Sequence, residues 1–263
     1  MSEPLKIVVC VKYVPDAAAD RSFSADNTTD RDAVDGRLSE LDEYAVEQAL
    51  KIVESGTDAE ITYLTMGPDD ATDALRKALS MGGDKAIHVN DPALHGADYA
   101  ATAKVLAAAA QKAGFDLVVC GMASTDGGGQ VVPAMIAEHL GVAQITFAGE
   151  ISVADGKVSI RRDGDTATER IEGPVPAVVS VTDQTGEARY PSFKGIMAAK
   201  KKPLETWSLA DLGIDASEVG LSAAWTAVED ITKRPPRQAG TIVKDEGDGG
   251  AKLAEFLAAQ KFI

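Results

Sequence analysis

The chain has few of the residues that build reactive or cross-linked sites. It contains two cysteines and three histidines in 263 residues. Cys10 and Cys120 each lie near the end of an apolar, strand-like run, so we expect buried free thiols rather than a disulfide framework or a zinc site. The histidines, His88, His95 and His139, are not spaced as metal ligands, and we expect structural or surface roles for them.

A catalytic signature is also missing. The sequence contains no Ser-His-Asp set, no nucleophile elbow, no P-loop and no G-x-G-x-x-G fingerprint. Asp126 is a candidate general base, although capping of a turn or contact with a ligand hydroxyl is the favoured interpretation. We therefore expect a binding or carrier protein without a catalytic constellation, and no metal site.

Positive charge and long apolar runs are scarce as well. The net charge is −15, from 41 acidic and 26 basic residues, which argues against general binding to DNA or RNA. No apolar stretch has the length of a membrane span. The short apolar run after Leu5 is expected to form a strand rather than a signal peptide. We therefore expect a cytoplasmic protein that does not insert into the membrane.

Strand-like and helical patterns alternate through the first 150 residues. Apolar runs predict strands at 5–11, 61–65, 86–89 and 117–120, and each is followed by a helical pattern before the next strand. This alternation predicts an α/β fold, a doubly wound and mostly parallel sheet with flanking helices. Ligands of such sheets bind beyond the carboxyl ends of the strands.

The pattern changes after residue 142. Alternating runs with Asp-Gly turns predict an added β-hairpin region. Its strands are expected at 145–153, 157–162 and 166–171, and a further strand at 177–181. We expect a first domain over 1–205 and an extended C-terminal arm over 206–263 with a short helix near its end. That arm cannot bury much against its own domain, which favours a partner surface.

A glycine-rich stretch, VVCGMASTDGGGQVVP at 118–133, is the most informative part of the chain. It joins a strand to a helix that has Pro133 near its start, and Gly127, Gly128 and Gly129 lie between them. Free N–H groups at a helix start attract anions, and glycines let the backbone approach a phosphate. The stretch is consistent with a nucleotide site and equally with a mobile surface loop. Further upstream, Ser39 and Asp42 form a capping-box pattern.

Six segments together resemble the β subunit of the electron transfer flavoprotein family over nearly the whole chain. The last of them, RYPSFKGIMAAKKKPLE, is the most specific. The segments are KIVVCVKYVPD at 6–16, ELDEYAVEQAL at 40–50, LRKALSMGGDKAIHV at 75–89, DLVVCGMASTDGGGQVVP at 116–133, PAVVSV at 176–181 and RYPSFKGIMAAKKKPLE at 189–205.

The resemblance implies an electron carrier that works as an αβ heterodimer. FAD is expected mainly in the α subunit, with this chain completing its site. AMP is expected as a structural nucleotide in this chain, or a second FAD as in flavin-bifurcating relatives. The implied partners are the α subunit, flavin dehydrogenases of the acyl-CoA dehydrogenase type and a membrane quinone oxidoreductase. The first domain becomes the nucleotide-binding domain, with a partner-recognition loop near 189–202.

The resemblance also implies two sets of contact residues. The nucleotide contacts are Cys10, Ser39, Glu40, Leu41, Asp42, Met66, Gly121, Met122, Ala123, Ser124, Thr125, Asp126, Gly127, Gly128, Gly129, Gln130, Val131 and Val132. The docking contacts are Tyr190, Pro191, Ser192, Phe193, Lys194, Gly195, Ile196 and Met197. Phe193 stands where the family usually carries Leu, and its polar, glycine-containing surroundings predict exposure. The lysines at 200–202 are interpreted mainly as a solvated helix end.

A nucleotide-binding sensor and a hydrolase are the two alternative functions. A stand-alone nucleotide-binding sensor would account for residues 1–145 but leaves 189–202 and the arm unexplained. A hydrolase of adenine nucleotides would need a catalytic base and a metal site that the sequence does not provide.

Overall fold

The computed structural model describes residues 3–237, 239–240 and 242–263. The chain divides into two compact units, Met1–Glu229 and Asp230–Ile263, which we describe separately. The first unit runs past residue 205 because the strand β12 (Leu204–Trp207) pairs with β5 (Lys85–Val89) at one edge of the main sheet.

The first unit is built on a seven-stranded sheet in which all paired strands are parallel. In the order β12-β5-β4-β1-β6-β11-β7, the strands are Leu204–Trp207, Lys85–Val89, Ala59–Met66, Leu5–Cys10, Leu117–Gly121, Ala177–Val181 and Ala143–Ala148. The chain builds outward from β1 to β4 and β5, then returns to β6 on the other side. The predicted doubly wound α/β fold is confirmed, and its switch point lies between β1 and β6.

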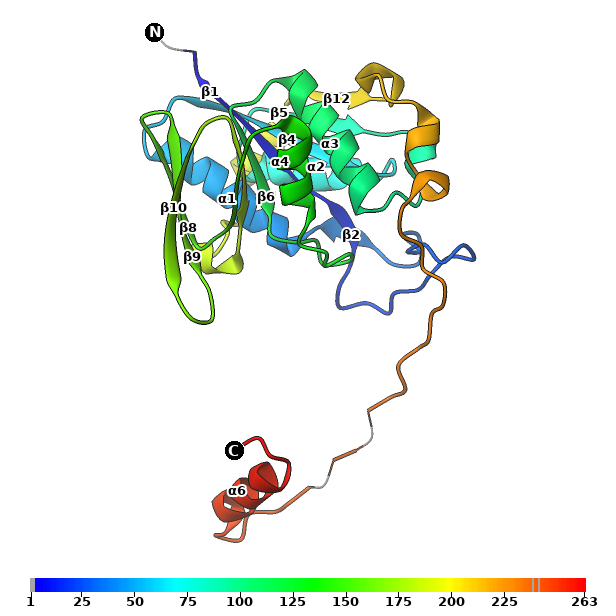
Figure 1. Ribbon diagram of the computed structural model, residues 1–263, viewed down its shortest axis with the longest axis vertical. Helices are drawn as coiled ribbons and strands as arrows, with labels where there is room; N and C mark the ends of the chain where they lie inside the picture. Colours follow the sequence, from blue (N-terminus) through cyan, green and yellow to red (C-terminus); the bar gives the residue numbers. More distant parts are fainter. Residues whose placement is uncertain (1–2, 238, 241) are drawn as a thin grey trace. The chain divides into compact units, whose positions relative to one another are not determined.

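Helices cover both faces of this sheet (Figure 1). α1 (Glu40–Glu54) and α2 (Ala71–Met81) lie on one face, and α3 (Tyr99–Ala113) and α4 (Val132–Leu140) on the other. Successive strand residues point to opposite faces. Ile7 and Val9 of β1 therefore join the core under α1 and α2, while Val8 joins the core under α3 and α4.

The run at 145–153, predicted as one hairpin strand, is two strands in different sheets. β7 (Ala143–Ala148) pairs in parallel with β11 in the main sheet, and β8 (Glu150–Ala154) belongs to a separate antiparallel sheet. Phe147 adopts a left-handed conformation with a φ of 63°, and Gly149 follows before β8 begins. Alternating hydrophobicity continues across this break, so the pattern alone predicted a single strand.

The remaining elements of the first unit are short. β8 pairs with β9, and β9 with β10, in the small antiparallel sheet, which confirms the added hairpin region. β2 and β3 form a two-stranded sheet, and α5 packs against α2. Their bounds are Lys157–Asp163 for β9, Thr168–Pro174 for β10, Tyr13–Pro15 for β2, Gly36–Leu38 for β3 and Phe193–Ala199 for α5. Short 3-10 turns occupy Pro92–Leu94, Asp183–Thr185, Ala210–Leu212, Ala216–Glu218 and Leu221–Ala223.

The second unit contains the helix α6 (Gly249–Ala259), in agreement with the short helix predicted near the end of the chain. None of its residues is buried, and the large side chains of Leu253 and Phe256 are exposed. Across the described residues of both units, no helix is long and apolar enough to span a membrane.

Candidate functional site

The candidate nucleotide site lies where β1 and β6 end. Lys12 follows β1, and a loop from Met122 to Val131 follows β6 and leads into α4. α1 begins beside them, since the main-chain N–H of Ser39 donates to the carbonyl of Lys12 over 2.9 Å. The strand order therefore assembles the site at the switch point, as the fold predicts.

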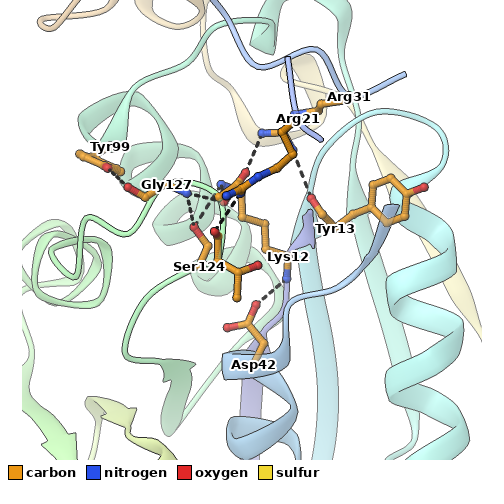
Figure 2. Close-up of polar contacts among 10 residues, drawn as sticks. Lys12, Tyr13, Arg21, Arg31, Asp42, Tyr99, Ser124 and Gly127 are labelled. Atoms are coloured by element: carbon orange, nitrogen blue, oxygen red, sulfur yellow. Dashed lines mark hydrogen bonds and ion pairs between the residues drawn. The ribbon is translucent and has the colours of Figure 1, made fainter. Parts of the chain in front are cut away.

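Asp126 is the centre of the loop's polar contacts, and Figure 2 shows its partners Lys12, Arg31 and Gly127 close together. Its Oδ1 lies 2.9 Å from the ammonium of Lys12, and its Oδ2 lies 3.0 Å from the guanidinium of Arg31. Oδ1 also accepts the N–H of Gly127 over 2.7 Å. Burial alone would raise the pKa of Asp126, but the charges of Lys12 and Arg31 and the hydrogen bonds outweigh it and hold that pKa well below its usual range. Asp126 is thus an ionised anchor of the loop rather than a general base.

The loop's amide groups fall into two sets. The N–H of Gly127 is bonded to Asp126 and Ser124, and the N–H of Gly128 donates to the carbonyl of Ser124 over 3.0 Å. In the described part of the chain, the N–H groups of residues 129–131 have no hydrogen-bond acceptor. Gln130 is held at a φ of 58°, a left-handed conformation that costs free energy for a residue with a side chain. The amides open to an anion therefore include those of 129–131, after the first two glycines. Among the described residues, the N–H groups of 123–126 at the start of the loop also have no acceptor.

Neither helix that starts at the site has a side-chain cap. At α4 the N-cap residue is Val131, which has no polar side chain, and at α1 it is Ser39, whose hydroxyl makes no capping bond. The Oγ of Ser39 is buried and has no hydrogen-bond partner among the residues that the structure describes. Each uncapped start leaves N–H groups and the positive end of the helix dipole free for an anion or a polar ligand.

The predicted capping box at α1 is wrong. The carboxylate of Asp42 accepts the main-chain N–H of Lys12 over 2.8 Å instead of reaching back to Ser39. The N–H of Ser39, which the box would satisfy, already donates to the carbonyl of Lys12. Lys12, which follows β1, therefore binds both groups that the capping box would join, the Asp42 carboxylate and the Ser39 N–H. The local spacing of Ser39 and Asp42 does not reveal this arrangement.

Asp42 is a buried carboxyl beneath the loop. Burial raises its pKa to about 7, against the opposing influence of the Lys12 amide and charge. A Cβ on Gly121 would lie 2.5 Å from Asp42 Oδ1 and 2.7 Å from the carbonyl of Leu41. Glycine is therefore required where β6 meets the start of α1.

Tyr99 and Arg21 brace the outer side of the loop. The hydroxyl of Tyr99, the first residue of α3, donates to the carbonyl of Gly127 over 2.7 Å. A Cβ on Gly129 would lie 2.3 Å from the Tyr99 ring, whereas one on Gly128 would meet nothing within 4 Å. Arg21 donates to the carbonyl of Thr125 over 3.1 Å. Gly129 is thus the sterically restricted glycine of the three, and Gly128 is special only for its φ of 63°.

The structure brings most of the predicted nucleotide contacts to one edge of the sheet. Cys10 ends β1, Ser39 to Asp42 form the start of α1, and residues 121–132 run from β6 into α4. Met66 ends β4, the neighbour of β1. Four residues that contact the loop or brace it were missed by the sequence analysis: Lys12, Arg21, Arg31 and Tyr99.

The predicted docking residues form a second surface around α5. Ser192 caps this helix, since its Oγ accepts the N–H of Gly195 over 3.0 Å. Tyr190 and Phe193 are 93% and 80% exposed, and Ile196 and Met197 are exposed as well. The exposure predicted for Phe193 is confirmed. The first unit thus presents four large apolar side chains within one short segment.

The base of this segment is fixed to α1. The guanidinium of Arg189 donates to Glu47 at 2.7 and 3.1 Å and to Glu54 at 2.6 and 2.9 Å, and its main-chain N–H donates to Glu47 at 3.1 Å. The bonds to the two carboxylates raise the pKa of Arg189 above its usual range. Such forked contacts hold a side chain in one orientation.

The other end of the segment is fixed to α2. Arg76 donates to the carbonyls of Ala199 and Lys202 at 2.7 and 3.0 Å. The ammonium of Lys202 donates to the carbonyls of Leu79 and Gly82 at 2.9 and 3.1 Å. Lys202 therefore caps the end of α2, which corrects the interpretation of the whole lysine run as a solvated helix end. Its neighbours Lys200 and Lys201 are exposed, as that interpretation expects.

The histidines and cysteines have separate environments. His88 is buried with Nε2 3.0 Å from the carbonyl of Gly67, and His95 lies on the surface with Nε2 2.7 Å from Asp26. Both cysteines are free thiols, but Cys10 is half-buried rather than buried. Among the described residues, no group of His, Cys, Asp or Glu side chains could hold a metal ion.

Comparison with known proteins gives one consistent result. The family model for the electron transfer flavoprotein domain matches residues 26–212. "Electron transfer flavoprotein subunit beta" of Mycobacterium leprae is 47% identical over 263 residues, covering 98% of this chain and 99% of the relative. The protein of that name from Mycobacterium tuberculosis (strain ATCC 25618 / H37Rv) is 46% identical over the same length and shares. The one from Megasphaera elsdenii is 34% identical over 270 residues, covering 98% of this chain and all of the relative.

Proposed function

The chain belongs to the electron transfer flavoprotein family, and from that premise we propose that it is the β subunit of a heterodimeric electron carrier. In this proposal it completes the site of an FAD held mainly by the α subunit, and it binds AMP at its own switch point. The flavin supplies the redox chemistry when bound, and this chain positions nucleotides and partners. It is a carrier subunit and not an enzyme in its own right.

The observation that best supports AMP binding is the set of free amides at the start of α4. Three successive N–H groups, at residues 129–131, lack acceptors beside an uncapped helix start. A phosphate accepts several such bonds at once and interacts favourably with the positive helix end. The buried Oγ of Ser39, which also lacks a partner, offers a further polar contact to the rest of the nucleotide.

Basic side chains near the loop add to this argument. Lys12 and Arg31 lie within 3.0 Å of Asp126 and are 37% and 32% exposed. Each has donors left for an incoming anion, because an ammonium carries three N–H groups and a guanidinium five. These two cations already pair with Asp126, and their remaining N–H donors would also stabilise the negative charge of a phosphate bound at residues 129–131.

A second FAD is the competing ligand at this site. AMP and FAD share the adenosine phosphate, so the amides at 129–131 fit either nucleotide. The two are distinguished by composition, since a second FAD doubles the flavin of the heterodimer and leaves no AMP.

The surface around α5 is proposed to dock flavin dehydrogenases of the acyl-CoA dehydrogenase type. Tyr190, Phe193, Ile196 and Met197 form an apolar patch, and an aromatic anchor of this kind is a common centre of a protein interface. Both ends of the segment are bonded to helices, so little ordering is needed on docking. A membrane quinone oxidoreductase is the proposed electron acceptor.

The second unit is proposed to pack on the α subunit. α6 exposes Leu253 and Phe256 and has no buried residue. An apolar helix of this kind is normally covered by a partner. The chain purified alone should therefore hold little or no FAD, and a yellow complex should form when it is expressed with its α subunit.

The test is spectroscopic and chromatographic. The heterodimer and the chain alone are purified, their flavin absorbance is recorded, and nucleotides are released by denaturation and separated. The proposal expects FAD and AMP in the heterodimer and almost no flavin in the chain alone. A stoichiometric FAD complex of this chain alone, or a heterodimer without flavin, would contradict it.

A further inference from the structure

The two cysteines of the chain lie on neighbouring strands. Cys10 is the last residue of β1, and Cys120 lies near the end of β6. These strands are paired in parallel up to Val9 and Val119, so the next residues, Cys10 and Cys120, lie opposite each other. Cys120 belongs to the core beneath α3 and α4, and Cys10 packs against that core. Their side chains therefore leave the same face of the sheet.

This placement satisfies the main geometric requirement for a disulfide. Neighbouring strands are about 4.8 Å apart, and the Cα atoms of disulfide-linked cysteines are usually about 4.4–6.8 Å apart. No large movement of the main chain is needed for a bond between Cys10 and Cys120.

The two thiols differ in access. Cys10 is half-buried, while Cys120 is 5% exposed. The Cys10 thiol beside it, together with burial, holds the pKa of the Cys120 thiol well above its usual range. A small reagent therefore reaches Cys10 first, and Cys120 stays protonated until a reactive sulfur lies next to it.

We propose that Cys10 and Cys120 form a reversible dithiol–disulfide site that exchanges with low-molecular-weight disulfides, Cys10 reacting first and Cys120 resolving the intermediate. This proposal rests on the strand register and the burial of the two residues. It does not depend on the function proposed above.

The exchange balances in two steps. The Cys10 thiolate attacks one sulfur of the small disulfide, whose S–S bond breaks and releases one small thiol. The Cys120 thiol then loses its proton, and its thiolate attacks the Cys10 sulfur. The S–S bond between Cys10 and the second small thiol breaks, and that thiol leaves with the proton. Two protein thiols are oxidised to one disulfide, and one small disulfide is reduced to two thiols.

The test uses the full chain and oxidised glutathione as the probe. After incubation the reaction is stopped in acid, free thiols are alkylated under denaturing conditions, and the intact mass of the chain is measured. The expected product has no alkylated cysteine, a mass lower by two hydrogen atoms, and the mobility of a single chain on a non-reducing gel. Dithiothreitol should restore two alkylation sites.

Two variants separate the roles of the cysteines. Cys120→Ala should stop at a stable adduct with one glutathione on Cys10, because no resolving thiol is present. Cys10→Ala should leave Cys120 free of glutathione and available to the alkylating reagent only after denaturation. Melting curves of both variants confirm that they are folded.

Three results would overturn the proposal. The natural chain keeps both thiols free throughout, or it accumulates a stable glutathione adduct at Cys10 while Cys120 stays free, or it forms disulfides only between chains. The natural chain alone decides among these results, so the proposal remains testable even if a variant fails to fold.

Discussion

The glycine loop at 124–131 and the docking segment at 189–202 are both on the surface, but they are held by different contacts. The loop is anchored by the charges of Lys12 and Arg31 on Asp126. The docking segment is anchored at one end by Arg189 on Glu47 and Glu54, and at the other by bonds to main-chain carbonyls.

The contrast separates a ligand site from a protein-binding surface. The loop keeps free amides and partly exposed cations, which are groups that an anion can use. The docking segment has the side chains of Arg189 and Lys202 bonded at its two ends and its large apolar side chains exposed, which are groups that a protein pocket can use. Changes in one region should therefore leave the function of the other intact.

The largest expected effect is on the pH dependence of stability near the loop. The folded-state pKa of Asp42 is raised to about 7, while the unfolded value is about 3.9. Stability from this group is fully present below about pH 4 and is lost as pH rises through 7. Asp42→Asn should gain stability relative to the natural chain by up to about 1.4 kcal/mol for each pH unit within that window.

Thermal melting of the chain from pH 4 to 8 measures this difference. Asp73→Asn, the same carboxyl-to-amide change at an exposed position of α2, is the matched control for the loss of one carboxyl. Curves of Asp42→Asn that run parallel to those of the natural chain would show that Asp42 titrates normally and is not a neutral group under the loop.

Phe193→Ala should have the next largest effect, on electron transfer alone. Removing an aromatic anchor from an interface commonly costs about 2 kcal/mol, which corresponds to roughly 30-fold slower transfer from the dehydrogenase. AMP content and melting temperature should stay the same because the ring is exposed. Steady-state reduction of the heterodimer by a cognate dehydrogenase measures the rate.

Phe23→Ala provides a matched control, since Phe23 is a half-exposed phenylalanine outside the docking segment. It should transfer electrons at the normal rate. Unchanged transfer with a lowered melting temperature in Phe193→Ala would mean that Phe193 is a packing residue.

The paired variants Gly129→Val and Gly128→Val sharpen the assignment of the loop amides. A side chain at 129 collides with the Tyr99 ring, so either this ring or the backbone that offers the free N–H groups must shift. We expect AMP affinity about tenfold lower, or about 1.4 kcal/mol, with unchanged docking. Gly128→Val should cost more in stability than in AMP affinity, because its φ of 63° is unfavourable but its side chain meets open space.

Calorimetric titration of AMP into the nucleotide-free heterodimer gives both affinities. Equal and small losses of AMP affinity in the two variants would show that residues 129–131 do not bind the phosphate. A larger loss of AMP affinity in Gly128→Val than in Gly129→Val would show that the phosphate binds at Gly127 and Gly128 instead.

Arg189→Lys should have the smallest effect, on the base of the docking segment. Lysine keeps the charge but cannot fork between Glu47 and Glu54. We expect a loss of stability of about 1 kcal/mol, the scale of one hydrogen bond, and a several-fold slower transfer with normal AMP content. Lost AMP in this variant would show that α1, which carries both Glu47 and Asp42, couples the two regions.

The alternation of strands and helices was predictable because the spacing of apolar residues along the chain differs between a strand and a helix. Ile7 and Val8 face opposite cores, as a strand buried on both faces requires. The left-handed Phe147 was not predictable, since nothing in its neighbours distinguishes it from a strand residue.

The candidate site was predictable only in part. The glycines at 127–129 reveal a backbone requirement locally, and resemblance to a family supplied the other contacts. The pairing of Arg31 with Asp126 spans 95 residues and arises from the path of an irregular segment, for which the sequence offers no periodic signal. Lys12 could have been predicted as a site residue, because its position directly after β1 places it at the switch point.

The nucleotide content of the heterodimer decides whether the loop holds AMP. The purified complex is denatured, and the released FAD and AMP are counted against protein. We expect one FAD and one AMP for each heterodimer. Two FAD and no AMP would contradict the assignment of the loop as an AMP site.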